Sequence, residues 1–194
     1  MRGDSVNRCD WANSHPLLTE YHDREWGVYT ENRQRLFEML ILEGAQAGLS
    51  WLSVLKRRPA YQEAFMGWRP EVAAAWSDAD LERLMTQPGI IHNRAKILSH
   101  RSNARAFLAV EDEFGGFAPY LFQWTGGNPL VHHFEHADQV PPYTQESERL
   151  SRDLVKRGFR FVGPTICYSY LQSLGVVVDH LVTCYRYRDL GVPG

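Results

Sequence analysis

Glu43 is a carboxylate in a mostly apolar stretch of the sequence, on a helix face that it shares with apolar residues. The segment Leu36–Ala47 (LFEMLILEGAQA) is apolar around nearly the whole circumference of a predicted α-helix, and Leu36, Leu40, Glu43 and Ala47 share one of its faces. Burial disfavours the charged form of a carboxylate and raises its pKa, and groups with perturbed pKa values are candidates for function. The alternative is a buried glutamate that a backbone amide or an arginine satisfies.

Aromatic residues precede and follow this glutamate. Trp11, Tyr21 and Trp26 come before the predicted helix, and Trp51 follows it directly. A single aromatic residue more often fills a core than binds a ligand. Around a buried carboxylate, however, several aromatic rings form a pocket that suits a flat cation, which a ring face and a charge-assisted hydrogen bond both attract.

Cysteine and histidine residues near both ends of the sequence suggest a metal site. The chain has three cysteines, which cannot all pair, and this count is typical of a reducing compartment where thiols stay free or bind metal. A set of two thiolates and two imidazoles closes a tetrahedral shell, as in structural rather than catalytic zinc sites. The candidate ligands are Cys9, His22, His180 and Cys184.

The spacing of the last two candidates predicts how they meet. His180 and Cys184 are four residues apart, which places them on one face of a helix predicted over Val178–Cys184. One zinc ion per chain would then join residues 8–30 to residues 178–185. The alternative is that a His-x3-Cys pair arises by chance. Cys167 lies in an apolar helical pattern and is interpreted as an inert core thiol.

The stretch Leu84–Ile97 (LMTQPGIIHNRAKI) has the pattern of a helix-hairpin-helix DNA-binding element. One helix ends, Pro88 and Gly89 turn the chain, and two isoleucines lead into the next helix. Free amides at the start of that helix suit a phosphate oxygen. The alternative is a plain helical hairpin with a solvated basic face. The predicted DNA contacts here are Gly89, Ile90, Arg94, Lys96 and Arg101. The last three lie on the second helix, which also carries Arg105.

The whole sequence predicts one all-α domain over residues 1–194. Its hydrophobic (44%) and charged (23%) fractions are ordinary for a globular protein, and its net charge of −2 argues against non-specific coating of nucleic acid by a basic protein. No segment resembles a signal peptide or a membrane span. We therefore expect a cytoplasmic protein, with residues 1–7 flexible and residues 8–30 an irregular, packed segment.

Capping residues and chain breakers set the expected helix boundaries. Gly48 ends the helix that carries Glu43, and Ser50 caps a short helix through Lys56. Ser77 and Asp80 form a capping box, Thr144 caps a helix to Arg157, and a helix starts at Pro164. The remaining expected ranges are 77–85 and 93–108 for the hairpin region (77–108), loops with short helices over 111–143, and helices over 144–157, 164–174 and 178–184.

Five ordered blocks give the sequence a family resemblance that runs from Arg8 to Tyr185. The chain resembles the type I DNA-3-methyladenine glycosylases, the Tag family, in the blocks YHDREWGV, LFEMLILEGAQAGLSW, GIIHNRAKI, KRGFRFVGPTICYSYLQ and DHLVTC. The resemblance implies a helix-hairpin-helix glycosylase fold of two helical lobes, with structural zinc joining the terminal segments. It also implies double-stranded alkylated DNA as the partner. We expect the enzyme to act as a monomer.

The resemblance also assigns roles to residues. It implies that Glu43 hydrogen-bonds the adenine edge, that Trp51 stacks on the base and that Tyr21 lines the pocket, with Trp11 and Trp26 at its wall. Gly48 and Leu49 match the tip that enters the gap in the DNA. This sequence departs from the family pattern at Leu18, where many relatives have tyrosine, and it matches poorly over 111–143.

The predicted activity is the flipping-out of 3-methyladenine and hydrolysis of its glycosidic bond, with Glu43 as the catalytic residue. No lysine is marked as a Schiff-base nucleophile, which predicts a monofunctional enzyme that leaves an abasic site. Three alternatives stay open: a DNA-binding alkylation sensor without chemistry, a hydrolase with catalytic zinc, and a glycosylase with a shifted base preference.

Overall fold

The computed structural model describes residues 6–190, and these residues are mostly helical. The expected lead at 1–7 and the tail at 192–194 lie outside this range except for Val6 and Asn7. The α-helices are α1 (Pro16–Arg24), α2 (Arg33–Gln46), α3 (Trp51–Leu55), α4 (Arg58–Ala64), α5 (Pro70–Ala74), α6 (Asp78–Thr86), α7 (Arg94–Phe114), α8 (Phe117–Phe122), α9 (Gln145–Lys156), α10 (Pro164–Ser173) and α11 (Tyr185–Asp189). The short elements are the 3₁₀ helices η1 (Asp10–Ser14), η2 (Gln123–Thr125) and η3 (Ala137–Gln139), with strands β1 (Leu130–Val131) and β2 (Val177–Val178).

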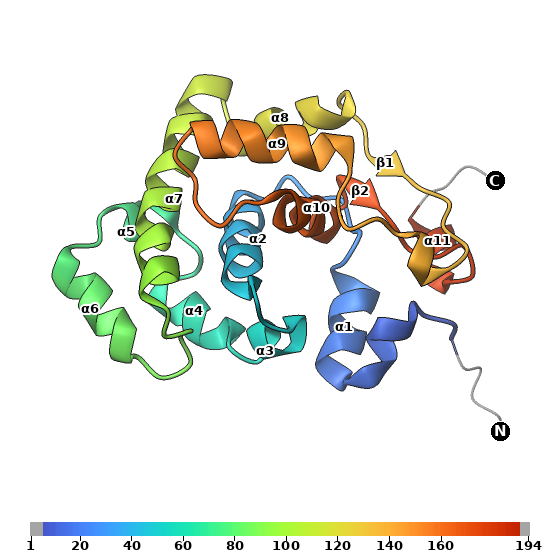
Figure 1. The fold of residues 1–194 in the computed structure, drawn as a ribbon, viewed down its shortest axis with the longest axis horizontal. Helices are drawn as coiled ribbons and strands as arrows, with labels where there is room; N and C mark the ends of the chain where they lie inside the picture. Colours follow the sequence, from blue (N-terminus) through green and yellow to red (C-terminus); the bar gives the residue numbers. More distant parts are fainter. Residues whose placement is uncertain (1–5, 191–194) are drawn as a thin grey trace.

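Helix α2 lies at the centre of the molecule, between α7 and α10 (Figure 1). Its apolar residues are buried on every side, as expected for a helix without a polar face. Helices α7 and α10 both pack on α2, and α9 packs on α10. Glu43 therefore sits on the most enclosed element of the fold. No helix within residues 6–190 is both long and apolar enough to cross a bilayer.

Most capping predictions are confirmed. The side chain of Ser50 accepts from the amide of Ser53, and Ser77 with Asp80 forms the predicted capping box. Thr144 caps α9. Gly48, directly after α2, has φ +78°, a left-handed conformation that reverses the chain toward α3. Helix α7 runs to Phe114, beyond the expected end at 108.

Two predictions about the terminal segments are wrong. Residues 8–30 are not irregular, because His15 caps α1 and Pro16 starts it, after the 3₁₀ helix η1. The predicted helix 178–184 does not form. Instead, β-branched Val177 and Val178 pair in parallel with Leu130 and Val131, and the chain then turns toward the short helix α11.

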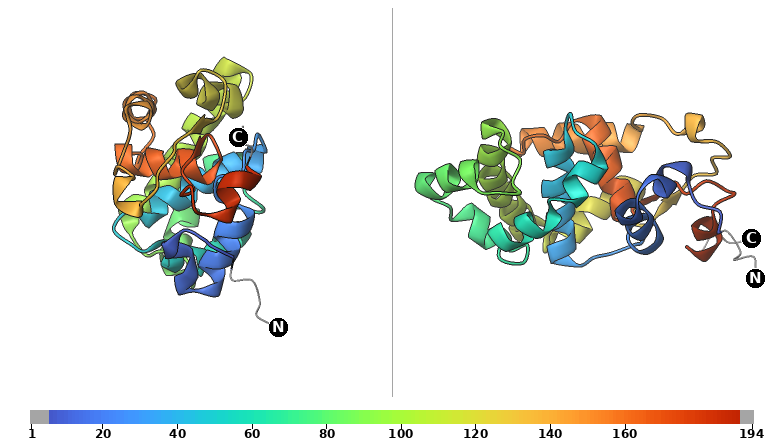
Figure 2. Two further views of the ribbon diagram at one scale, coloured as in Figure 1. Left: turned by 90° about the vertical axis from the view of Figure 1, so that its right-hand side faces the viewer. Right: turned by 90° about the horizontal axis from the view of Figure 1, so that it is seen from below.

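The N-terminal and C-terminal segments lie side by side at one end of the molecule (Figures 1 and 2). The amide of Tyr185 donates to the carbonyl of Asn7 at 2.9 Å, and the Asn7 side chain donates to the carbonyl of Thr183 at 2.7 Å. These contacts bring the two pairs of candidate metal ligands together. The division into two helical lobes and the boundaries within the chain stay predictions.

Candidate active site and metal centre

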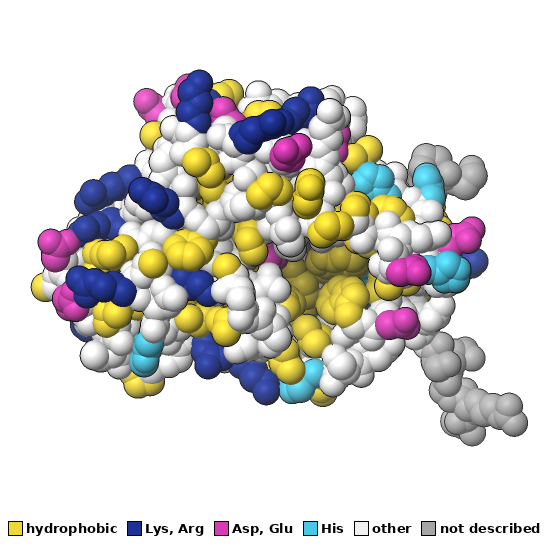
Figure 3. Space-filling view, viewed as in Figure 1, with side chains coloured by type: hydrophobic (Ala, Val, Ile, Leu, Met, Phe, Trp, Pro, Cys, Tyr) yellow, Lys and Arg dark blue, Asp and Glu magenta, His cyan; other side chains and the backbone are white. Residues whose placement is uncertain are grey.

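A cavity of about 510 Å³ opens beside α2, and it is the apolar hollow seen in Figure 3. Helices α1, α2, α3 and α10 and the segment around Trp11 form its wall. All five predicted pocket residues line it. The lining residues are Trp11, Ser14, Leu18, Tyr21, Trp26, Glu43, Gln46, Ser50, Trp51, Leu52, Ser169 and Gln172.

Glu43 is the only acidic residue that lines this cavity within the described chain. Its side chain is 3% exposed, and its Oε2 atom has no hydrogen-bond partner among residues 6–190. Burial raises the pKa of Glu43 to about 8, and the positive charge of Arg35 opposes part of that shift. A neutral, unpartnered carboxyl group therefore faces an apolar cavity near neutral pH.

Two aromatic pairs surround this carboxyl group. The rings of Tyr21 and Trp51 are 5.2 Å apart at their centroids and tilted by 54°. The rings of Trp11 and Trp26 are also 5.2 Å apart, in an edge-to-face arrangement. The buried Nε1 of Trp51 has no acceptor within the described part of the chain. An unpaired donor and an unpaired acceptor thus belong to residues of one cavity, which is typical of a ligand site.

Sequence reasoning missed the polar residues that α10 contributes to the pocket. Ser169 and Gln172 lie three positions apart and share one face of α10. The Nε2 of Gln172 donates to buried Asp179 at 2.6 Å, which fixes the amide. Asp179 also accepts from Tyr168 and contacts His132. A pair of polar residues at helical spacing in the YSYLQ block was the signal that could have found them.

Two further polar residues of the cavity come shortly after Glu43 in the sequence. Gln46 lies three residues after Glu43, and Ser50 begins the next helix. Leu18, the departure from the family pattern, also lines the cavity and is 8% exposed. An aliphatic side chain here leaves this part of the wall without a ring or a hydroxyl group. On α1, therefore, Tyr21 supplies a ring to the wall and Leu18 does not.

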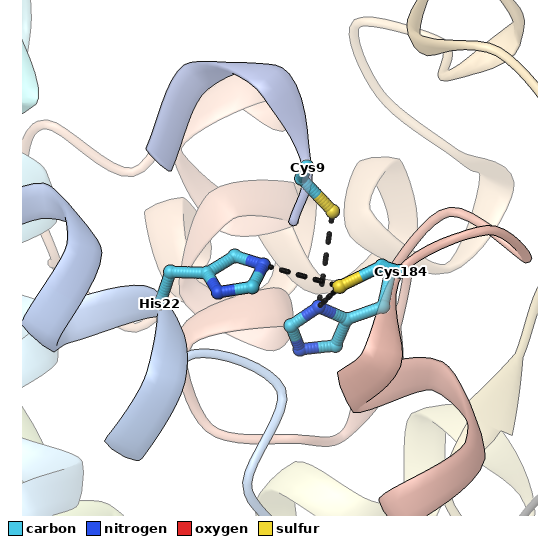
Figure 4. Close-up of side chains that lie close together, drawn as sticks. Cys9, His22 and Cys184 are labelled. Atoms are coloured by element: carbon cyan, nitrogen blue, oxygen red, sulfur yellow. Dashed lines mark hydrogen bonds between the residues drawn. The ribbon is translucent and has the colours of Figure 1, made fainter. Parts of the chain in front are cut away.

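The four candidate metal ligands converge at the terminal end of the molecule (Figure 4). The ligand atoms of Cys9, His22, His180 and Cys184 all lie within 4.8 Å of one another. The Sγ of Cys184 is 3.5 Å from the Nε2 of His22 and 3.6 Å from the Nδ1 of His180, while the Sγ of Cys9 is 3.8 Å from that Nδ1. Tetrahedral zinc with ordinary bond lengths separates sulfur and nitrogen ligands by about 3.5 Å. The cluster fits such an ion, although no helical face aligns His180 with Cys184.

Neighbouring groups hold both imidazoles in one orientation. The Nδ1 of His22 is 2.8 Å from Asp23, whose carboxylate accepts two hydrogen bonds from Arg8. The Nε2 of His180 is 3.0 Å from the carbonyl oxygen of Trp26. These contacts use the ring nitrogens that face away from the cluster, as the outer partners of metal-bound histidines do.

The two clustered thiols differ in acidity. Their mutual hydrogen bond raises the pKa of Cys9 and lowers the pKa of Cys184. A cation at the centre of the cluster would favour the thiolate form of both. The donor set, the distances and the outer hydrogen bonds all agree with a four-coordinate structural site.

Ile90 and Gly89 of the turn between α6 and α7 pack against other parts of the protein. Ile90 is 4% exposed, and its amide is used within the turn, where it donates to Gln87 at 3.3 Å. Gly89 has φ +84°, and a Cβ atom there would lie 2.6 Å from the Cβ of Ala60. Close packing on α4 thus accounts for this glycine without the predicted DNA contact, which stays a prediction.

The structure contradicts the predicted DNA contact of Lys96. Its side chain is 5% exposed, and its ammonium group donates to the carbonyls of Ala45 at 2.8 Å and Ala47 at 2.6 Å. Lys96 therefore caps the C-terminal end of α2 from within the protein. Spacing alone could not reveal this, because a lysine and an arginine of the same helix can face opposite environments.

The other two predicted cations of the hairpin helix lie at the surface with acidic partners. Arg94 pairs with Glu82 at 2.7 Å, and both side chains are more than half exposed. Arg101 pairs with Asp78 at 2.8 Å and donates to the carbonyl of Trp76. Exposed pairs of this kind are weak and can exchange for a phosphate. Leu49, the predicted wedge, is 40% exposed in the turn after α2.

Comparison with known proteins identifies the family. The model of the methyladenine glycosylase family matches residues 11–187. The DNA-3-methyladenine glycosylase 1 of Escherichia coli K12 is 43% identical over 182 residues, which cover 94% of this chain and 97% of that protein. The DNA-3-methyladenine glycosylase of Haemophilus influenzae is 41% identical over 92% of this chain and 97% of its own length.

Solved structures agree with the sequence comparison. A crystal structure of 3-methyladenine DNA glycosylase I has a TM-score of 0.89 and 45% identity over 92% of this chain and 98% of its own. The Staphylococcus aureus enzyme, described as showing the structural basis of 3-methyladenine recognition, has a TM-score of 0.89 and 36% identity over 93% of this chain and 96% of its own. The chain belongs to the methyladenine glycosylase family.

Proposed function

We propose that this protein is a monofunctional DNA glycosylase of base excision repair, which hydrolyses the N-glycosidic bond of 3-methyladenine in alkylated double-stranded DNA and leaves an abasic site. The observation that carries this proposal is the unpartnered, buried carboxyl group of Glu43 in an aromatic-lined cavity. Family membership supplies the reaction class.

The cavity selects for a cationic base by electrostatics. With its pKa near 8, Glu43 is mostly neutral in the empty site, which avoids the cost of a buried charge. A cationic base lowers that pKa, so the proton leaves and a charge-assisted hydrogen bond forms, worth about 1.5–3 kcal/mol. The ring face of Trp51 adds about 0.5–2 kcal/mol of cation–π attraction. Neutral adenine receives neither contribution.

The leaving group needs little help from the protein. Methylation at N3 gives the adenine a positive charge, so the base departs as a neutral molecule without a strong acid to protonate it. General acid–base catalysis, worth roughly 10²–10⁴ in rate, can therefore be partly omitted. The chain has three lysines, Lys56, Lys96 and Lys156, and none lines the cavity. This distribution supports hydrolysis by water without a Schiff-base intermediate.

The nucleotide reaches the cavity by flipping out of the duplex, which costs a few kcal/mol. We assign the wedge to Gly48 and Leu49. A groove of about 500 Å³ separates Leu49 from the hairpin residues Gly89, Ile90 and Ile91. Lys56 and Arg57 line this hairpin groove, and neither has a carboxylate within 4.0 Å among residues 6–190. Both can therefore bind phosphate without breaking an ion pair.

We assign one structural zinc ion to Cys9, His22, His180 and Cys184. When bound, zinc supplies a cross-link between the terminal segments and leaves no ligand position for water. The closed donor set supports this role over a catalytic one. We propose further that the enzyme works as a monomer in the cytoplasm, where the odd number of thiols stays reduced.

Base release from methylated duplex DNA tests the proposal. Single-turnover reactions with wild type and Glu43→Gln, followed by chromatographic separation of the released bases, should give 3-methyladenine with wild type. The variant should release it about 10- to 150-fold more slowly, because it loses the charge-assisted contact of about 1.5–3 kcal/mol. Release of no base by folded, metal-loaded wild type would leave a DNA-binding sensor. Equal rates would remove the role given to Glu43.

A further inference from the structure

A second basic groove lies along α7, apart from the hairpin groove. Its volume is about 720 Å³, and it lies between α7 and the segment that follows α9. We call it the α7/α9 groove. Lys and Arg side chains gather over α7 on the same face as the apolar hollow (Figure 3). The basic residues that line it are Arg101, Arg105, Arg157 and Arg160.

Two of these four arginines have no acidic partner. Arg101 is paired with Asp78, and Arg157 is paired with Asp153 and Glu113. In the described chain, Arg105 and Arg160 have no carboxylate within 4.0 Å. The Nε of Arg105 donates to a backbone carbonyl at 2.9 Å, which leaves its two terminal nitrogens available. The groove therefore presents two uncompensated guanidinium groups in a protein whose net charge is −2.

The backbone at Arg160 is held in a fixed position. Asn103 of α7 is 2% exposed, donates to the carbonyl of Arg160 at 3.0 Å and accepts from its amide at 2.8 Å. A buried side chain is thus committed to holding an exposed arginine at the rim of the groove. This pairing fixes the backbone from which the Arg160 side chain extends.

Phe161, the residue after Arg160, has a strained backbone and packs against α2, the helix that carries Glu43. Phe161 has φ +56°, a left-handed conformation that costs a non-glycine residue about 1–3 kcal/mol. A Cβ atom at Gly44, the neighbour of Glu43, would lie 3.4 Å from the carbonyl oxygen of Phe161. The segment that carries Arg160 therefore packs directly on α2 beside the base pocket. Strain of this kind persists where the surrounding structure enforces it, often at functional sites.

We propose that the α7/α9 groove binds phosphates of the DNA duplex, as a second contact with the backbone besides the hairpin groove. This inference rests on the proposed function. Guanidinium groups bind phosphate oxygens in bidentate geometry, and the groove offers two that no carboxylate neutralises. When a nucleotide is flipped out, protein contacts must hold the duplex at more than one place, because these contacts offset the cost of unstacking. Contacts in this groove bind DNA of any sequence.

The test is the salt dependence of duplex binding by the double variant Arg105→Ala/Arg160→Ala. Each lost phosphate contact should reduce the slope of log K against log salt by about 0.9. Affinity for an undamaged duplex should fall at least about tenfold at 0.1 M salt. Binding of free 3-methyladenine, and base release at saturating DNA, should stay within about twofold of wild type. A slope equal to that of wild type would overturn the proposal.

A control variant distinguishes the loss of contacts in the α7/α9 groove from the loss of two positive charges. Arg24→Ala/Arg188→Ala removes two exposed arginines from α1 and α11, at the opposite end of the molecule. It should leave the slope unchanged, and an equal reduction in both double variants would refute a specific contact. Titration with inorganic phosphate distinguishes a small-anion site: loss of phosphate binding with an unchanged duplex slope would also refute the proposal. Base release by wild type tests the proposed function independently.

Discussion

The Cys/His cluster and the aromatic-lined cavity are adjacent, yet their buried polar atoms differ in whether they have hydrogen-bond partners. In the cluster, both ring nitrogens of His22 and His180 have partners, and so do the thiols of Cys9 and Cys184. In the pocket, the Oε2 of Glu43 and the Nε1 of Trp51 have none in the described chain. The first arrangement stabilises the fold, and the second keeps binding capacity for a ligand.

Trp26 belongs to both regions. Its ring lines the base pocket, and its carbonyl oxygen holds the outer nitrogen of His180. Tyr21 and His22 are likewise consecutive, with one side chain in each region. The two regions therefore differ although they are built from neighbouring residues, and three experiments test the difference.

The largest effect should come from the cluster. Cys184→Ser removes one ligand of the proposed zinc site, so the variant should lose bound zinc and several kcal/mol of its free energy of unfolding, because structural zinc binding is folding free energy. Metal analysis combined with chemical denaturation measures both. Cys167→Ser is the matched control, since that buried thiol lies outside the cluster and donates to the carbonyl of Val162. Equal zinc content and stability in Cys184→Ser and wild type would remove the structural role.

Glu43→Gln should stabilise the protein although it should slow base release. The folded state keeps the Glu43 proton up to about pH 8, whereas the unfolded chain releases it near 4.5. Unfolding therefore releases a proton between these values, and wild-type stability falls by about 1.4 kcal/mol per pH unit there. The variant lacks this loss and should be more stable by about 3 kcal/mol at pH 7.

Denaturation of both proteins at pH 5, 6, 7 and 8 measures this difference. Comparison at each pH cancels changes at the metal ligands, which the two proteins share. The difference should grow steadily with pH. Parallel stability curves would mean that Glu43 has a partner in solution and is not an open binding group.

A smaller effect should come from the aromatic wall. Trp51→Leu removes the ring that is paired with Tyr21, so single-turnover release of 3-methyladenine should fall by about 2- to 30-fold, the equivalent of 0.5–2 kcal/mol. Trp51→Phe keeps a ring face and should lose less. Equal losses in the two variants would show that packing, and not the face of the ring, carries the contribution of Trp51.

The sequence predicted the elements better than it predicted how side chains use them. Capping residues such as Ser50, Ser77 and Thr144 predicted helix starts because their hydrogen bonds are local. The helix expected at 178–184 was wrong because pairing of Val177 and Val178 with a distant segment overrides local spacing. Tertiary contacts of this kind leave no periodic signal in a short segment.

The same limit applies to predicting the candidate site from the sequence. The place of Glu43 in the cavity was predictable because this carboxylate shares a helix face with apolar residues. The Cys/His cluster was predictable because the chain has only three cysteines to consider as ligands. Lys96 was not, because only the fold reveals that the C-terminal end of α2 lies within reach of its ammonium group. Gln172 escaped notice because its partner, Asp179, lies outside α10, in the loop directly after β2.

The position of the metal ligands along the chain has a consequence for synthesis. Cys9 and His22 leave the ribosome early, but His180 and Cys184 follow only after nearly the whole intervening sequence has been translated. At ordinary elongation rates this delay is roughly ten to thirty seconds. During that time the nascent chain cannot close the cluster, and the carbonyl of Trp26 lacks its imidazole partner. A prematurely terminated product would therefore lack the means to assemble the wall of the pocket, and the cell would gain repair capacity only from completed chains.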